Sequence, residues 1–154
     1  MREITDENRD AVTSLRVSPA QEPYVAGVAE SLEEAAGEPE ARPCYRAVYV
    51  DDAPVGFVML SENVPPGDER YPWRYYLWRL LIDERFQRRG YGAETLDVLI
   101  TELRGRPGAD ELFTSVVPGN ESPVGFYERY GFVRTGEIFD EEIVLRLDLR
   151  RARA

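Results

Sequence analysis

The stretch Phe86-Gln87-Arg88-Arg89-Gly90-Tyr91-Gly92 (FQRRGYG) lies between two segments with different hydrophobic periods. Before it, residues 73–82 (WRYYLWRLLI) are rich in aromatic and branched side chains, which is typical of a strand. After it, apolar residues recur at the spacing of one helix face, at Leu96, Leu99, Ile100 and Leu103. The stretch therefore predicts a strand-to-helix turn.

A turn of this composition has the chemistry of a phosphate site. Backbone N–H groups at a helix N-terminus are unpaired and carry the positive end of the helix dipole. We expect Gly90 and Gly92 to allow positive φ and the close approach of a phosphate. Further donors are expected from the side chains of Gln87, Arg88 and Arg89. The segment lacks the third glycine of a dinucleotide fingerprint, and the alternative is an arginine-rich solvated turn.

The composition is that of a globular chain. With 154 residues, 43% of them hydrophobic and 31% charged, we expect one domain over 1–154 with one core. The chain has no apolar run of about 18 residues, so no membrane span is expected. Its charged start, MREITDENRD, is unlike a secretory signal, which predicts a cytoplasmic protein.

Two residue types are missing, and both absences restrict the chemistry. The chain has no histidine and no lysine, and all 19 basic residues are arginine. Histidine-activated nucleophiles, histidine-bound metals, Walker-type loops and Schiff-base lysines are therefore excluded, and we expect no metal. The net charge of −10 argues against a nucleic-acid partner and suits a cationic substrate. The alternative is that the charge only keeps the protein soluble.

The rest of the chain predicts a mixed α/β domain with one central sheet. Strands are expected at 2–5, 44–50, 55–60, 73–82, 111–117 and in two closing segments around a turn near 139–140. Helices are expected at 6–17, at 24–36, from the glycines to about 103, and at 123–130 between a Ser122 cap and Gly131. The predicted order is β-α-α-β-β-β-α-β-α-β-β.

A second motif, NESPVGFYERYGF, occupies residues 120–132. Together with QRRGYG it resembles the GNAT superfamily of N-acetyltransferases, whose pyrophosphate loop reads [QR]-x-x-G-x-[GA] and whose later motif ends in [LF]-Y-x-x-x-G-F. Segments 77–92, 116–132 and 135–149 look most like bacterial spermine/spermidine acetyltransferases. The resemblance implies a single GNAT-type domain, with a mixed, mostly antiparallel central sheet and helices on both faces.

The resemblance also implies acetyl-CoA as cosubstrate and direct transfer of its acetyl group to an amine in a ternary complex. It places the pantetheine arm along the backbone of Leu80, Leu81 and Ile82, where the strand splays from its neighbour, with one amide at the thioester oxygen. It assigns the pyrophosphate to Gln87, Arg88, Arg89, Gly90, Tyr91, Gly92 and Ala93, and the CoA arm to Asn120.

By the same resemblance, Tyr127 is the general acid. A phenol has a pKa near 10, so it is protonated at neutral pH and can donate to the departing thiolate. Helical periodicity alone fits a core aromatic equally. Some related polyamine enzymes have a carboxylate where this chain has Trp78 and Arg79. The base is therefore open between Glu62, Glu84 and water.

Between Arg16 and Arg42 the chain has six glutamates and no basic residue. In GNAT folds the first two helices form one wall of the acceptor cleft, and here the turn at 140–142 would border another. Such a cleft would attract a polycation. Glu22, Tyr24 and Trp78 are the expected acceptor contacts.

Three functions from different classes stay open at this point. The first is acetylation of a small-molecule amine, with a polyamine or diamine favoured. The second is acetylation of a protein N-terminus or lysine, and the third is a CoA-binding regulatory module without catalysis. The oligomeric state is open as well, with a homodimer as one option.

Overall fold

The computed structural model describes residues 1–150. Within them, one six-stranded sheet has the order β1-β2-β3-β4-β6-β5. Its strands are β1 (Pro43–Val50), β2 (Ala53–Ser61), β3 (Tyr76–Ile82), β4 (Glu111–Val116), β5 (Val133–Phe139) and β6 (Glu142–Asp148). β3 and β4 are parallel and the other neighbours are antiparallel. The predicted mixed, mostly antiparallel sheet is confirmed.

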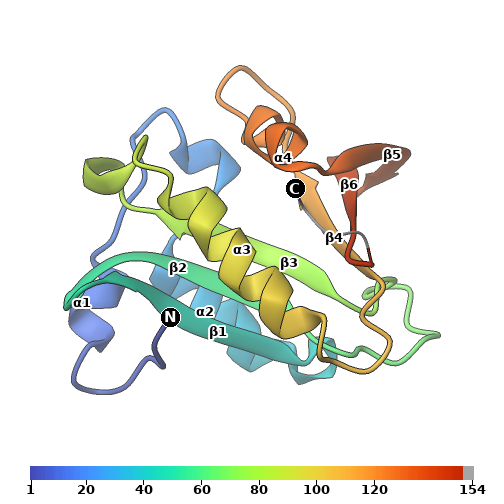
Figure 1. The fold of residues 1–154 in the computed structure, drawn as a ribbon, viewed down its shortest axis with the longest axis horizontal. Helices are drawn as coiled ribbons and strands as arrows, with labels where there is room; N and C mark the ends of the chain where they lie inside the picture. The colour runs from blue at the N-terminus through green and yellow to red at the C-terminus, as the bar shows by residue number, and fades with distance from the viewer. Residues whose placement is uncertain (151–154) are drawn as a thin grey trace.

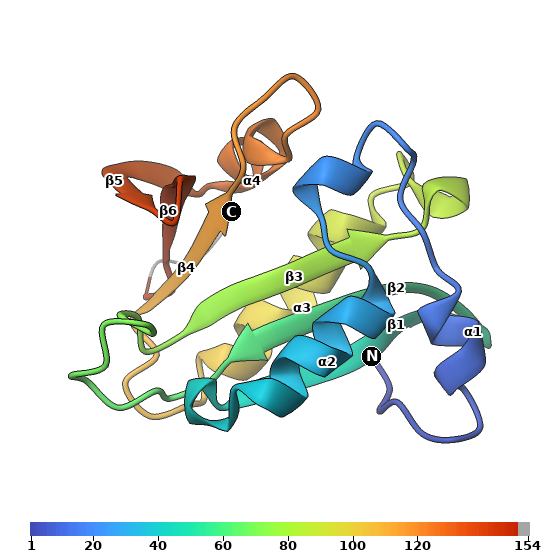
Figure 2. The same cartoon turned by 180° about the vertical axis from the view of Figure 1, so that it is seen from behind.

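Helices cover both faces of the sheet, as expected. α3 (Tyr91–Leu103) crosses one face, and α1 (Arg9–Thr13) and α2 (Val28–Gly37) cover the other (Figures 1 and 2). Side chains of β2 alternate between the two apolar cores: Val58 packs in the core that contains α3 and α4 (Val124–Tyr130), and Phe57 packs in the core with α1 and α2. The two-sided burial makes β2 a central strand.

The N-terminal region differs most from the prediction. Residues 2–5 form no strand; Arg2 makes only an isolated bridge to Ala47. The side chain of Asn8 accepts from the Thr5 N–H at 2.8 Å and donates to the Glu3 carbonyl at 3.0 Å, which bends the chain away after that one bridge. The predicted first strand is therefore wrong.

Both predicted N-terminal helices are shorter than expected. α1 covers only five residues, and the helix predicted over 24–36 begins only at Val28 in α2, after a 3-10 turn, η1 (Glu22–Tyr24). Val25 and Gly27 between them are extended, with ψ of 118° and 168°. Residues 25–27 therefore separate η1 from α2, and Tyr24 of η1 and Val116 at the end of β4 line the same hollow.

The parallel pair β3 and β4 separates early. The two strands pair only at Tyr76 with Phe113 and Leu77 with Thr114, although β3 continues to Ile82. The ribbon shows the two strands diverging beyond that point (Figures 1 and 2). The predicted splay of residues 80–82 is confirmed, and it opens the space in which the candidate site lies.

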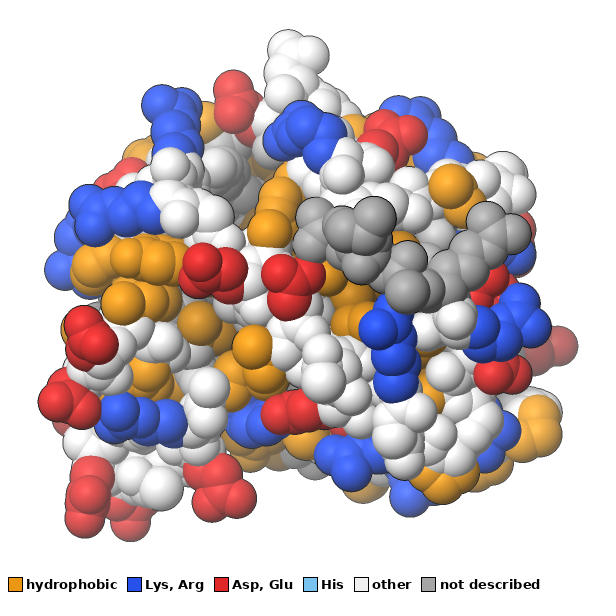
Figure 3. All heavy atoms as spheres, in the orientation of Figure 1, with side chains coloured by type: hydrophobic (Ala, Val, Ile, Leu, Met, Phe, Trp, Pro, Cys, Tyr) orange, Lys and Arg blue, Asp and Glu red, His pale blue; other side chains and the backbone are white. Residues whose placement is uncertain are grey.

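The charges are dispersed over the face that α3 covers. In the space-filling view, acidic and arginine side chains are interspersed there (Figure 3). In the described part of the chain no helix is long and apolar enough to cross a bilayer, and α3 has only 13 residues.

Candidate active site

The glycine turn begins α3. Gly90 is the N-cap of α3 with φ of 85°, and Arg88 before it also has a left-handed φ of 65°. A Cβ at Gly90 would meet no atom within 4 Å, so this side of the turn is open to a ligand. The predicted positive φ is correct for Gly90.

For Gly92 the predicted positive φ is wrong. Gly92 lies inside α3 and is absent from the residues with positive φ. A Cβ there would lie 3.1 Å from Phe126 Cζ. Gly92 therefore permits close packing of α3 against α4, rather than a special backbone conformation.

Gln87 holds the loop in place. Its Nε2 donates to the Ile82 carbonyl and to Gln21 Oε1, each at 2.8 Å, and its Oε1 accepts from Gln21 Nε2 at 3.1 Å. The side chain that was expected to donate to a phosphate is thus hydrogen-bonded to the protein. The remaining donors at the turn are the backbone N–H groups and the exposed arginines Arg88 and Arg89.

A hollow of about 800 Å³ lies along this turn. Of the predicted cofactor contacts it is lined by Leu80, Ile82, Gln87, Arg88, Gly90, Tyr91, Gly92, Ala93 and Asn120. The side chains of Leu81 and Arg89 do not line it. Leu81 is 1% exposed and packs in the opposite core, because successive residues of a strand point to opposite faces.

A second hollow, of about 270 Å³, adjoins the first. It contains all three predicted acceptor contacts, Glu22, Tyr24 and Trp78. Two further carboxylates also line it, Glu30 from α2 and Glu142 from the start of β6. The sequence had indicated acidic walls from these two regions, and the structure brings both to one hollow.

The two hollows share four lining residues: Val25, Leu80, Pro123 and Tyr127. Tyr127 projects from α4 and is 5% exposed. Burial raises the pKa of Tyr127 far above its ordinary value; nearby Tyr76 adds to this effect, and a hydrogen bond with Thr114 partly opposes it. The phenol is therefore protonated at neutral pH, as a proton donor must be.

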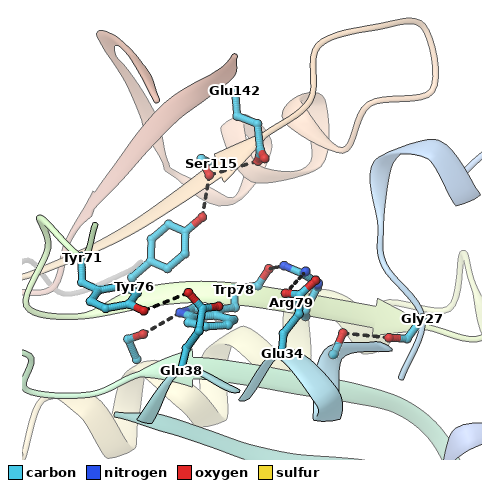
Figure 4. A network of polar contacts seen from close by, with 11 residues as sticks. Gly27, Glu34, Glu38, Tyr71, Tyr76, Trp78, Arg79, Ser115 and Glu142 are labelled. Atoms are coloured by element: carbon cyan, nitrogen blue, oxygen red, sulfur yellow. Dashed lines mark hydrogen bonds and ion pairs between the residues drawn. The ribbon is translucent and has the colours of Figure 1, made fainter. Parts of the chain in front are cut away.

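A hydrogen-bonded chain links Tyr76 to Ser115 and Glu142, two residues that line the second hollow (Figure 4). The Tyr76 and Ser115 hydroxyl oxygens are 2.5 Å apart, and Ser115 Oγ donates to Glu142 Oε1 at 3.1 Å. Burial raises the pKa of Tyr76 to about 12; Ser115 opposes the shift, and Glu142 adds to it. Nearby, Arg79 Nη2 pairs with Glu34 Oε2 at 2.7 Å.

The structure does not bring Glu62 or Glu84, the two predicted bases, to the large hollow or to the acidic one. Neither lines either hollow. Burial raises the pKa of the Cys44 thiol and Glu62 adds to that shift, which places the carboxylate near Cys44. Glu84 is exposed, and its N–H donates to the Arg16 carbonyl. Glu142, which lines the second hollow, was not named as a candidate base from the sequence. Its only indication was that the acidic turn at 140–142 would border the acceptor cleft.

Residues 1–150 contain no group of three or more His, Cys, Asp or Glu side chains placed to hold a metal ion. The polar groups described above are phenols, a hydroxyl, carboxylates and arginines. Together they can position a cationic substrate and move protons.

The chain belongs to the acetyltransferase (GNAT) family, whose model matches residues 8–132. It is 30% identical to the spermine/spermidine N(1)-acetyltransferase of Bacillus subtilis (strain 168), over 97% of each chain. Its fold is similar to that of an aminoglycoside acetyltransferase in complex with coenzyme A, with a TM-score of 0.73 and 15% identity over 96% of this chain and 92% of that one. An acetyltransferase from Thermus thermophilus has a TM-score of 0.71 at 18% identity, over 96% and 94%. The protein is therefore an N-acetyltransferase that uses acetyl-CoA.

The larger hollow fits this cosubstrate. At one end are the open backbone at Gly90, the first turn of α3 and the guanidinium of Arg88, which suit a pyrophosphate. At the other end is the part of β3 that β4 does not pair with, which suits an amide-containing arm. Tyr127 lies where this hollow meets the acidic one.

Proposed function

We propose that the enzyme acetylates a primary amine of a polyamine or diamine, by direct attack in a ternary complex. The observation that carries the proposal is that the large hollow and the acidic hollow meet at Leu80 and Tyr127. Two substrates can then be held at once with their reacting ends adjacent, which removes the need for a covalent enzyme intermediate.

The lining of the acidic hollow supports a cationic acceptor. Three carboxylates line it, Glu22, Glu30 and Glu142, and its one arginine, Arg79, is paired with Glu34. The hollow therefore has a negative net charge, which attracts an ammonium. The relative from Bacillus subtilis, named a spermine/spermidine acetyltransferase, supports the same acceptor class. The volume of about 270 Å³ favours a small amine over an extended peptide.

Acetyl-CoA supplies an activated acetyl thioester. Beyond Leu77, β3 has no ladder partner on β4 among the described residues, so N–H groups on that edge are free to polarise a carbonyl. Tyr127 then protonates the leaving thiolate. We assign the base to Glu142, acting on the ammonium directly or through Ser115, in preference to Glu62 or Glu84.

Initial rates of thiol release from acetyl-CoA test the proposal. The panel contains spermidine, spermine, short diamines, an aminoglycoside and a peptide with a free N-terminus, with the wild type assayed beside Tyr127→Phe. We expect saturable turnover of polyamines, and a loss of kcat by roughly 10²-fold in the variant. If only the peptide is turned over, the enzyme is a protein acetyltransferase and the proposal is wrong. If acetyl-CoA binds but no amine is turned over, the protein is a regulatory module.

A further inference from the structure

A third, smaller hollow of about 90 Å³ adjoins the acidic one. Its walls include one carboxylate and five aromatic rings: Glu38, Tyr71, Trp73, Tyr76, Trp78 and Phe139. Trp78 lines both this hollow and the acidic hollow. Tyr76 lines the small one with its ring, while its hydroxyl reaches Ser115 in the acidic one (Figure 4). The two spaces are therefore neighbours that meet at Trp78 of β3.

Contacts among the walls fix the aromatic rings. Trp73 stacks on Tyr76 with ring centroids 5.0 Å apart and meets the edge of Phe139 at the same distance. Trp78 Nε1 donates to Ser61 Oγ at 2.5 Å. Because the rings come from β3, the loop before it and β5, the small hollow is formed before any ligand enters, which lowers the entropy cost of binding.

The charge of the small hollow comes from Glu38. The Tyr71 hydroxyl donates to Glu38 Oε1 at 2.8 Å, which aims the carboxylate at the ring cluster (Figure 4). Arg70 also lines the hollow, but Asp68 pairs with it through contacts of 2.8 and 3.1 Å and offsets its charge. A carboxylate among aromatic faces is the chemistry that binds an alkylammonium, through charge and cation–π attraction.

We propose that this small hollow, the aromatic subsite, binds the distal ammonium of the acceptor while the reacting amine lies at Tyr127. The inference rests on the proposed polyamine function and adds a specificity element to it. An acceptor that spans from Tyr127 past Trp78 to Glu38 gains the second contact, and a monoamine with the same reacting end does not. The subsite therefore selects amines by chain length and by the presence of a second charge.

The test compares two acceptors, spermidine and propylamine, through the ratio of their kcat/KM values. Glu38→Gln removes the carboxylate at nearly constant shape, and Glu40→Gln is the matched control, an exposed glutamate two residues away that does not line the subsite. We expect the ratio to fall roughly 5- to 20-fold in Glu38→Gln and to stay within about twofold of wild type in Glu40→Gln. Trp73→Leu should lower the ratio as well, with a thermal melt to verify its fold.

The outcomes separate this inference from the function it rests on. If the wild type turns over no polyamine, the proposed function itself fails. If the wild type acetylates spermidine but Glu38→Gln keeps the wild-type ratio, the function stands and the subsite is wrong. An equal fall in Glu38→Gln and Glu40→Gln would also overturn the subsite, because it would show a general effect of charge rather than contact.

Discussion

Ser115 on β4 donates a hydrogen bond to Glu142 on β6 at 3.1 Å, and this contact orients a carboxylate inside the acidic hollow. Tyr76 lies 2.5 Å from Ser115, and its pKa of about 12 keeps it protonated at neutral pH. Ser115 donates its single hydroxyl hydrogen to Glu142, so Tyr76 is the donor to Ser115. The Glu142 carboxylate is therefore the last hydrogen-bond acceptor of this chain.

Glu142→Gln should lower kcat/KM for spermidine at neutral pH by roughly 10²-fold, because the ammonium then has no carboxylate to take its proton. The deficit should shrink as the pH approaches about 10, because a growing fraction of the primary amine is then already deprotonated in solution. A pH profile of kcat/KM from about 6.5 to 10 measures this. Glu141→Gln, an exposed neighbour outside the hollow, is the control. A deficit of constant size across the profile would assign Glu142 to binding alone.

The parts of the site that could be predicted from sequence are those determined by local chemistry. A glycine with φ of 85° at the start of an amphipathic helix, and a tyrosine seven residues after Asn120, lie within contiguous motifs. Gly92 shows the limit of that reasoning, because its contact with Phe126 joins residues 34 positions apart. The motif identifies Gly92, but only the packing of α3 against α4 shows why a glycine is needed at that position.

The acceptor side depends on contacts far apart in the chain. Glu30 and Glu142 line one hollow although 112 positions separate them, and the order of strands that brings β6 beside β4 is not encoded in a local pattern. Glu62 and Glu84 were plausible bases by their position after strands, yet their side chains lie outside the hollow. The N-terminal errors have a different origin, since Asn8 and Gly27 redirect the chain through local hydrogen bonds and a single dihedral angle that the hydrophobic pattern does not reveal.

Substitutions of Arg79 and of Glu34 should change KM for the acceptor in opposite directions. The Arg79 side chain is 21% exposed and pairs with Glu34 at 2.7 Å, and its Nε has no hydrogen-bond partner among the described residues. Glu34→Gln leaves the guanidinium uncompensated beside the acceptor, so KM for spermidine should rise. Arg79→Gln frees a carboxylate, so KM should fall. We expect KM for spermidine to change about 3- to 10-fold in each direction at low salt, and by less at high salt. Changes of the same sign would contradict the electrostatic explanation.

Asp83 should make stability depend on pH. Burial alone would raise the pKa of the Asp83 carboxyl, but hydrogen bonds from the Arg85 side chain and from the backbone N–H groups of Arg16 and Arg85 outweigh it and hold the pKa below its usual value. A depressed folded-state pKa stabilises the protein above the unfolded value, about 3.9, and this stability is lost as the pH falls through the folded value.

Asp83→Asn should therefore lower the free energy of unfolding by about 1–3 kcal/mol at pH 7. The difference in unfolding free energy between Asp83→Asn and the wild type should become smaller below roughly pH 4. Urea unfolding at several pH values measures both effects. Asp52→Asn, whose side chain is 98% exposed, serves as the control and should leave stability within about 0.5 kcal/mol of wild type. A gap that does not change with pH would show that Asp83 acts through shape rather than charge.

Gly56→Ala should damage both stability and the use of acetyl-CoA. Gly56 pairs with Ile82 across β2 and β3, and a Cβ there would lie 2.4 Å from the Leu81 carbonyl oxygen and 2.8 Å from Ile82 Cδ1. Because the nearer atom belongs to the backbone, β3 itself must shift. We expect a loss of about 1–3 kcal/mol in unfolding free energy. We also expect a rise in KM for acetyl-CoA, since Ile82 lines the large hollow.

Gly37→Ala is the matched comparison for this variant. Gly37 is the last residue of α2 and has no atom within 4 Å of an added Cβ, so alanine there should be neutral or stabilising by up to about 1 kcal/mol. Urea denaturation gives the stability of both variants, and acetyl-CoA titrations at saturating spermidine give KM. If Gly56→Ala is destabilised but keeps the wild-type KM, the shift of β3 does not reach Ile82, and the close approach of β2 and β3 serves stability alone.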